Sequence, residues 1–136
     1  MPTPIAAGPI HHLRLTVSDV DRSRAFYTEV LGFQHVMDLP GGFFLSNGAV
    51  GLGLGPSPDP TRAPVGDRFD EARVGLDHLS FSVASRDELE RARQLLDERG
   101  IPHGEVTDLG DAFGLCILAF RDPDNIQLEM FYMDPQ

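Results

Sequence analysis

Apolar and polar residues alternate in two stretches of the chain that repeat one pattern. Residues 12–17 read His-Leu-Arg-Leu-Thr-Val, and residues 78–83 read His-Leu-Ser-Phe-Ser-Val. Because side chains alternate between the two faces of a strand, each stretch predicts a strand with one apolar and one polar face. Self-similarity of this kind predicts that the chain contains two copies of one structural module.

A helical pattern follows each of these strands and stops at a glycine. Apolar residues at helical spacing predict helices over about Asp21–Leu31 and Arg86–Arg99. Gly32 and Gly100 come next, at the place where a left-handed residue commonly ends a helix. The second helix is the more clearly signalled, because Ser85–Glu88 fits a capping box at its start.

Three short strand-like runs complete each copy. They lie at about Phe33–Met37, Gly42–Ser46 and Val50–Leu54 in the first half and at about Gly104–Asp108, Leu115–Arg121 and Ile126–Tyr132 in the second. Turn-forming sequences stand just before the last strand of each half, Asn47-Gly48 in the first and Asp122–Asn125 in the second. Each half therefore reads β-α-β-β-β.

A segment rich in proline and charge separates the two halves. We predict an α+β fold in a single domain over residues 1–136, with a first βαβββ module at about 10–55 and a second at about 75–133. Residues 56–74 are expected to form a linker without strong secondary structure.

Charge and composition narrow the class of protein. The formal net charge is −10, and every basic residue is an arginine. Nucleic-acid affinity rests largely on neutralising phosphates, so this balance argues against such a partner. No run approaches the roughly 20 apolar residues of a membrane span, and Met1–Pro9 does not resemble a signal peptide. A cytoplasmic protein that binds neither nucleic acid nor membrane is expected.

The polar strand faces carry residues that can bind a metal ion. His12 shares its face with Arg14 and Thr16, and His78 occupies the same register in the second copy. In the last predicted strand Glu129 points away from the apolar side and can join the histidines. Two imidazoles and one carboxylate suit a divalent Fe, Mn, Ni or Zn ion and leave coordination positions open. We therefore predict a metal site made of His12, His78 and Glu129.

The sequence resembles the vicinal oxygen chelate superfamily, also called the glyoxalase, bleomycin-resistance and dioxygenase group. The motifs that carry the resemblance are Ile10–Asp19, Ala25-Phe-Tyr with Leu31-Gly-Phe33, Gly75–Val83 and Phe120–Glu129. The resemblance implies two βαβββ modules that form a cupped mixed sheet around a central cavity. It also implies a substrate that chelates the metal through adjacent oxygens, and it places the ligands on His12, His78 and Glu129.

One departure from the superfamily pattern bears on the reaction. Glyoxalase I and methylmalonyl-CoA epimerase take a further Glu or Gln ligand from the last strand of the first module. That position falls on Leu52 or Gly53, depending on the alignment, and neither can bind a metal. The resemblance thus implies a three-ligand enzyme of the dioxygenase, thiol-transferase or natural-product-tailoring kind. Arg14 can hold an anionic group or pair with an acidic neighbour, and no residue stands out as the catalytic acid or base.

A protein that sequesters an antibiotic without chemistry is the alternative interpretation. Members of the bleomycin-resistance kind bind drugs in aromatic-lined clefts, commonly between two chains. Five phenylalanines could line such a cleft or else belong to the core: Phe43, Phe44, Phe69, Phe113 and Phe131. The candidate residues for binding substrate or drug are Arg14, Thr16, Phe44, Phe113 and Phe131. A homodimer is also expected, because exposed sheet edges are usually covered, with the modules paired within a chain or by swapping between chains.

Overall fold

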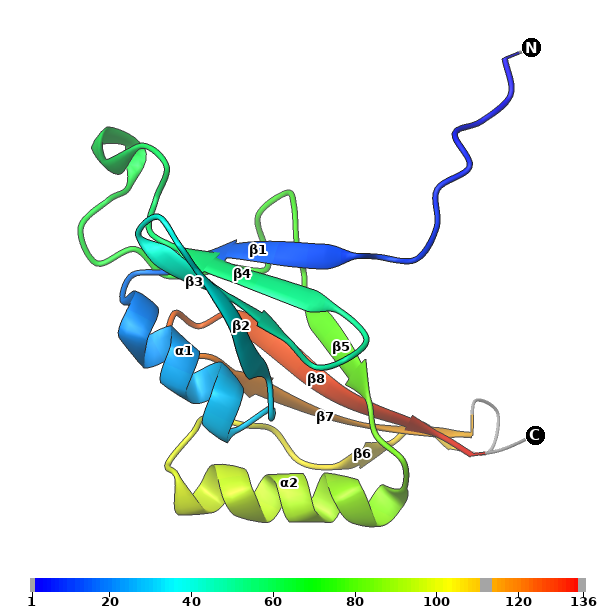
Figure 1. Cartoon of the computed structure of the whole chain (residues 1–136). Helices are drawn as coiled ribbons and strands as arrows, with labels where there is room; N and C mark the ends of the chain where they lie inside the picture. The colour runs from blue at the N-terminus through cyan, green and yellow to red at the C-terminus, as the bar shows by residue number, and fades with distance from the viewer. Residues whose placement is uncertain (1, 111–113, 135–136) are drawn as a thin grey trace. The chain divides into compact units, whose positions relative to one another are not determined.

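The computed structural model describes residues 2–110 and 114–134 and divides into two compact units. The first unit covers Met1–Ala63 and the second covers Pro64–Gln136. Within the described residues, each unit contains one α-helix and one four-stranded mixed sheet, with the elements in the order β-α-β-β-β (Figure 1). The predicted fold class, α+β with two similar βαβββ modules, is confirmed.

The first unit is built around a sheet with strand order β1-β4-β3-β2. Its elements are β1 (His12–Thr16), α1 (Val20–Glu29), β2 (Gln34–Leu39), β3 (Gly42–Ser46) and β4 (Gly51–Gly55), followed by a 3-10 turn at Pro60–Arg62. Strands β1 and β4 are parallel, and the other neighbours are antiparallel. Helix α1 packs against β3 and β4, so it covers one face of this sheet.

The core of the first unit lies between α1 and the apolar sheet face. Leu45, Leu52 and Leu54 are buried on the strands, and Tyr27 is fully buried on the helix. Asp19 caps α1, since its carboxylate accepts a hydrogen bond of 3.0 Å from the Arg22 N–H. This packing turns the other set of strand side chains away from the helix.

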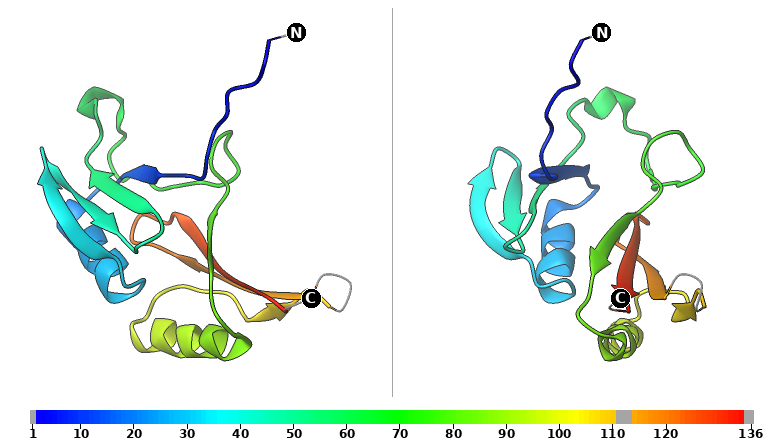
Figure 2. Two further views of the ribbon diagram at one scale, coloured as in Figure 1. Left: turned by 45° about the vertical axis from the view of Figure 1, so that its right-hand side comes forward. Right: turned by 90° about the vertical axis from the view of Figure 1, so that its right-hand side faces the viewer.

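The second unit repeats the arrangement with strand order β5-β8-β7-β6. Its elements are β5 (Leu79–Ser82), α2 (Arg86–Glu98), β6 (Thr107–Asp108), β7 (Leu115–Arg121) and β8 (Gln127–Met133). Helix α2 packs against β7 and β8, as the two views of Figure 2 show. The buried residues on this side of the sheet are Cys116, Leu118, Phe120 and Leu128. Within the described part of the chain, no helix is long and apolar enough to cross a membrane.

The turn between β7 and β8 is held by a buried carboxylate. Asp122 Oδ1 accepts hydrogen bonds of 2.8 Å from the backbone N–H groups of Asp124 and Ile126. Asn125 adopts a left-handed conformation with φ of 69°, which asparagine tolerates better than most residues. The Asn125 side chain and the Asp124 carbonyl bind the backbone of Phe69, so this part of the proline-rich segment is fastened to the second unit.

Candidate functional site

The sheet face opposite α1, here called the first open face, carries the polar residues of β1. His12, Arg14 and Thr16 are all exposed. Their partners on the parallel strand β4 are, in the same order, Gly51, Gly53 and Gly55. We call these three residues the glycine floor, because they add no side chain to the open face. Side chains of neighbouring strands can therefore lie flat across it.

Arg14 uses the space that the glycine floor leaves. A Cβ added to Gly53 would lie 3.5 Å from Arg14 Cγ, and one added to Gly55 would lie 3.0 Å from Arg14 Cζ. The guanidinium thus extends along β4 above both glycines. Within its own unit, Arg14 makes no hydrogen bond or ion pair with a described residue. Its five N–H donors remain available to an anionic ligand.

An aromatic ring lies near His12 on the same face and also lines a hollow. Phe44 of β3 lies over Gly51, with its ring centroid 6.1 Å from that of His12. This hollow, of about 380 Å³, is lined in part by His11, Phe44 and Gly51. The Nδ1 atoms of His11 and His12 are 2.9 Å apart, so one ring donates a hydrogen bond and the other accepts it.

The sheet face opposite α2, the second open face, brings together two of the predicted ligands. Glu129 of β8 pairs with Ser80 of β5, and its Oε1 accepts a hydrogen bond of 2.8 Å from the Ser80 hydroxyl. His78 Nε2 lies 3.8 Å from Glu129 Oε2. Two ligand atoms bound at about 2.1 Å to one ion lie roughly 3 to 3.5 Å apart. A small side-chain adjustment would let this pair share an ion.

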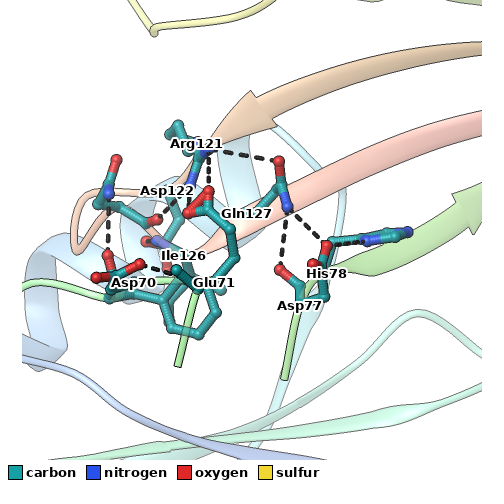
Figure 3. A network of polar contacts seen from close by, with 11 residues as sticks. Asp70, Glu71, Asp77, His78, Arg121, Asp122, Ile126 and Gln127 are labelled. Atoms are coloured by element: carbon teal, nitrogen blue, oxygen red, sulfur yellow. Dashed lines mark hydrogen bonds and ion pairs between the residues drawn. The ribbon is translucent and has the colours of Figure 1, made fainter. Parts of the chain in front are cut away.

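A chain of polar contacts runs from His78 to Arg121 at the end of β7 and to Glu71 (Figure 3). His78 Nδ1 lies 2.7 Å from Asp77 Oδ1, and Gln127 donates to the same carboxylate oxygen at 3.0 Å. Arg121 is 3.4 Å from the Gln127 amide oxygen. Arg121 also binds both carboxylate oxygens of Glu71, at 2.9 and 2.7 Å. The Arg121 guanidinium is already paired with a carboxylate of the protein. We therefore assign Arg121 a structural role and not a role in binding substrate.

The hydrogen bond from Arg121 lowers the pKa of Glu71 from 4.5 to about 2. A carboxyl group whose folded-state pKa is depressed stabilises the fold above its unfolded pKa, and this contribution is lost as the pH falls through the folded value. We expect the difference in unfolding free energy between wild type and Glu71→Gln to be largest above pH 4.5 and to shrink toward about pH 2. Urea unfolding followed by circular dichroism over this range measures it. A difference that does not change with pH would contradict the prediction.

The strand registers define the position of the missing fourth ligand. Glu129 pairs with Ser80, two residues after His78. In the first unit the residue two after His12 is Arg14, and its partner is Gly53. Of the two alignments that the sequence allows, the structure supports the one in which Gly53 of the first module is equivalent to Glu129 of the second. A glycine offers no side-chain ligand atom, and the Arg14 side chain occupies the adjacent space.

The predicted ligands are divided between the units. His12 belongs to the first unit, whereas His78 and Glu129 belong to the second. Within either unit alone, the described residues include no group of three or more His, Cys, Asp or Glu side chains that could hold a metal ion. The chemistry of the donor set, two imidazoles and one carboxylate, fits a divalent ion. The metal triad thus stays a prediction that requires residues from both units.

The aromatic candidates differ in their placement. Phe44 lies on the first open face, and Phe131 shares the second open face with Glu129, two residues away on β8. Phe43 instead faces α1, where the guanidinium carbon of Arg24 lies 4.3 Å from its ring centroid. Phe113 lies outside the described residues.

Sequence reasoning missed three polar residues around the candidate ligands, of which one contacts His78, one contacts Glu129 and one binds the carboxylate beside His78. These are Asp77, Ser80 and Gln127. A carboxylate directly before His78 was a signal in the sequence. The roles of Ser80 and Gln127 depend on the register between β5 and β8, which local patterns do not define.

The chain belongs to the Glyoxalase/Bleomycin resistance protein/Dioxygenase superfamily, whose family model matches residues 9–130. This is the vicinal oxygen chelate superfamily that the sequence motifs resemble. Its members commonly use divalent metals. The superfamily includes glyoxalase-type enzymes and resistance proteins, so membership defines the fold and the class, while the activity depends on the site.

Similar proteins cover nearly the whole chain. YwkD of Bacillus subtilis (strain 168), named as an uncharacterized protein, is 36% identical over 129 residues, which span 90% of this chain and 94% of YwkD. A glyoxylase/bleomycin resistance protein/dioxygenase domain from Frankia sp. EAN1pec is 34% identical, with a TM-score of 0.77 over 95% of this chain and 100% of that one. TnmS3, an antibiotic binding protein from Streptomyces sp. CB03234, shares the fold at 21% identity, with a TM-score of 0.67 over 96% and 100% of the two chains.

Proposed function

We propose that the protein is a metal-dependent small-molecule enzyme of the three-ligand type, in which His12, His78 and Glu129 hold a divalent Fe, Mn, Ni or Zn ion. The observation that supports this most strongly is the pair on the second open face, where His78 Nε2 lies 3.8 Å from Glu129 Oε2. His12 stands in the matching register of the first unit. When bound, the ion would polarise the chelating oxygens of the substrate as a Lewis acid.

The protein's own residues have separate tasks in this proposal. Ser80 holds Glu129 Oε1 by a hydrogen bond of 2.8 Å, so that Oε2 is left for the ion. Arg14, extended along the glycine floor, binds an anionic group of the substrate, and Thr16 adds a hydroxyl on the same face. Phe44 and Phe131 provide apolar contacts on the first and second open faces. The proposed substrate is therefore a small anion with two adjacent oxygens.

The missing fourth ligand bears on the class of reaction. Gly53 leaves open a coordination position that a Glu or Gln side chain fills in glyoxalase I. The substrate's two adjacent oxygens can then take the open positions on the ion. This favours a dioxygenase-, thiol-transferase- or natural-product-tailoring-like reaction over a glyoxalase reaction.

We also propose that the protein is a cytoplasmic homodimer, in which the modules pair either within one chain or between the two chains.

Metal content is the direct test of this proposal. We expect protein purified without chelator to carry a divalent ion, and we expect His78→Ala to lower the affinity by about 100-fold or more, since even outer-shell changes cost 10- to 100-fold. Elemental analysis and competition with a chelating dye measure both quantities. His35→Ala is the matched control, because His35 pairs with Asp38 on β2 and is not a predicted ligand.

Two results would count against the enzyme proposal. If the wild type and His78→Ala hold equally little metal under all loading conditions, the triad is not a metal site. A loss of metal in His35→Ala equal to that in His78→Ala would show that the effect is not specific to the triad.

Antibiotic sequestration remains the second candidate function. The observation that favours it is the aromatic residue on each open face, Phe44 near the hollow of about 380 Å³ and Phe131 on β8. A sequestering protein would bind an aromatic drug with equal affinity before and after treatment with chelator. It would also release the drug unmodified after long incubation, whereas an enzyme would convert its substrate.

A further inference from the structure

We propose that Asp77 is a positioning residue that keeps the neutral His78 ring protonated on Nδ1, so that Nε2 is the atom offered toward Glu129. The use of Nε2 in metal binding rests on the proposed function. The tautomer itself does not, because it follows from contacts within the second unit alone.

The contact between Asp77 and His78 defines which nitrogen carries the proton. The 2.7 Å separation between Asp77 Oδ1 and His78 Nδ1 is that of a strong hydrogen bond. An ionised carboxylate can only accept, so Nδ1 must be the donor and Nε2 must hold the lone pair of the neutral ring. Glu129 Oε2 is 3.8 Å from Nε2, which is too far for a hydrogen bond that would keep the proton there.

Asp77 is itself held in place by Gln127. The Gln127 side-chain N–H donates to Asp77 Oδ1 at 3.0 Å and to the Asp77 backbone carbonyl at 3.1 Å. Through these two hydrogen bonds, Gln127 on strand β8 holds both the side chain and the main chain of Asp77 in place. The carboxylate therefore faces His78 in one orientation, although its side chain is 66% exposed.

The Gln127 amide is oriented in turn by Arg121 and Glu71 (Figure 3). Arg121 Nη2 lies 3.4 Å from Gln127 Oε1, a long contact that selects the orientation with the amide N–H groups toward Asp77. The bidentate pair between Arg121 and Glu71, at 2.9 and 2.7 Å, fixes the guanidinium. The polar chain thus links part of the proline-rich segment to the orientation of a candidate ligand.

The first unit lacks an equivalent carboxylate. The residue before His12 is His11, and the two Nδ1 atoms are 2.9 Å apart. An imidazole nitrogen can donate or accept, so this contact does not define the tautomer of His12 as a carboxylate does. We infer that the second unit supplies the preorganised imidazole and that His12 is the more adaptable of the two.

Nitrogen NMR of the metal-free protein tests the tautomer. With ¹⁵N-labelled histidine, at a pH above the ordinary range of histidine pKa values, two-bond ¹H–¹⁵N correlations report which ring nitrogen is protonated. We expect His78 in the wild type to be the Nδ1–H form. In Asp77→Ala we expect it to shift to the Nε2–H form that a free neutral imidazole favours. Asp77→Asn keeps an acceptor of the same size, so it should retain the Nδ1–H form in part.

Asp67→Ala is the matched control for the loss of one carboxylate. Asp67 is exposed in the same unit, and no hydrogen bond or ion pair joins its side chain to a described residue. We expect this variant to keep the wild-type tautomer. A wild-type His78 in the Nε2–H form, or an Asp77→Ala variant that stays in the Nδ1–H form, would overturn the proposal.

Zinc-binding measurements test the proposed function separately from the proposed tautomer of His78. We expect Asp77→Ala to weaken Zn²⁺ binding by about 10-fold or more, as for other outer-shell partners of metal-binding histidines, and Asp67→Ala to leave it unchanged. If the tautomer shifts in Asp77→Ala but neither the wild type nor any variant binds Zn²⁺ or another divalent ion, the positioning role stands and the proposed function fails.

Discussion

Replacing Gly42 by alanine is expected to lower the unfolding free energy of the first unit by about 3 kcal/mol. Gly42 opens β3 and is buried. A Cβ at this position would overlap the carbonyl oxygen of Leu54, and it would lie 3.0 Å from the Leu54 carbonyl carbon and 3.1 Å from Gly55 Cα. All of these atoms belong to the backbone of β4. The clash can therefore be relieved only by moving β3 away from β4.

Such a shift would also disturb the first open face. Strand β3 carries Phe44, whose ring lies over the glycine floor, and Phe44 pairs with Gly53 of β4. We therefore expect Gly42→Ala to weaken the binding of any ligand that contacts this face, in addition to its effect on stability. Urea or guanidinium unfolding followed by far-ultraviolet circular dichroism measures the change in stability.

Gly53→Ala is the matched control from the same sheet. Its Cβ would lie 3.5 Å from Arg14 Cγ, an ordinary van der Waals contact with a flexible side chain. We expect a change in unfolding free energy within about 0.5 kcal/mol. If Gly42→Ala and Gly53→Ala unfold at the same denaturant concentration, β3 and β4 do not approach each other at Gly42 as closely as described, and the prediction is wrong.

Most of the fold could be predicted because its signals are local. The period of the apolar residues and the glycines after the helices located α1 and α2 to within two residues at each end. Both glycines after the helices, Gly32 and Gly100, have the left-handed conformation, with φ of 74° and 66°.

The strand expected over Gly104–Asp108 is wrong in length, since only Thr107 and Asp108 pair with β7 in a ladder. Before them, His103 forms an isolated bridge with Phe120, and the Gly104 N–H donates a hydrogen bond to the Ala119 carbonyl.

The candidate site could be predicted only in part. Alternation along β1 and β8 placed Arg14 and Glu129 on faces away from the helices, as the structure has them. The contacts that organise these residues are long-range, and the pair between Arg121 and Glu71 spans 50 residues. No local pattern encodes such a pair. The choice between Leu52 and Gly53 likewise depended on how β1 aligns with β4, which is a tertiary property.

Asp122→Ala is expected to lower the unfolding free energy of the second unit by about 3 kcal/mol. Asp122 is 5% exposed, and its Oδ1 accepts two backbone hydrogen bonds of 2.8 Å, from Asp124 and Ile126. Hydrogen bonds to a charged group contribute about 1.5 to 3 kcal/mol each, and alanine would leave both N–H donors without this partner. Denaturant unfolding measures the loss.

Asp122→Asn is the conservative control for this prediction. The asparagine carbonyl oxygen can replace Oδ1 as the acceptor, so the two hydrogen bonds from Asp124 and Ile126 are kept but lose their charge assistance. We expect a decrease of about 1 kcal/mol, consistent with neutral hydrogen bonds being the weaker kind. If Asp122→Asn were as unstable as Asp122→Ala, the negative charge itself would be required in the turn, and the account based on two accepted hydrogen bonds would be wrong.

Comparing Asp122→Ala with Asp77→Ala distinguishes a loss of fold stability from a local change at the candidate metal site. Strand β8 begins directly after this turn and carries both Gln127 and Glu129, so Asp122→Ala should reduce Zn²⁺ affinity as well as stability. Asp77→Ala should reduce Zn²⁺ affinity with little change in stability, because its side chain is 66% exposed. If Asp77→Ala destabilised the fold as much as Asp122→Ala does, the polar chain would be a structural element first, and its effect on His78 would be secondary.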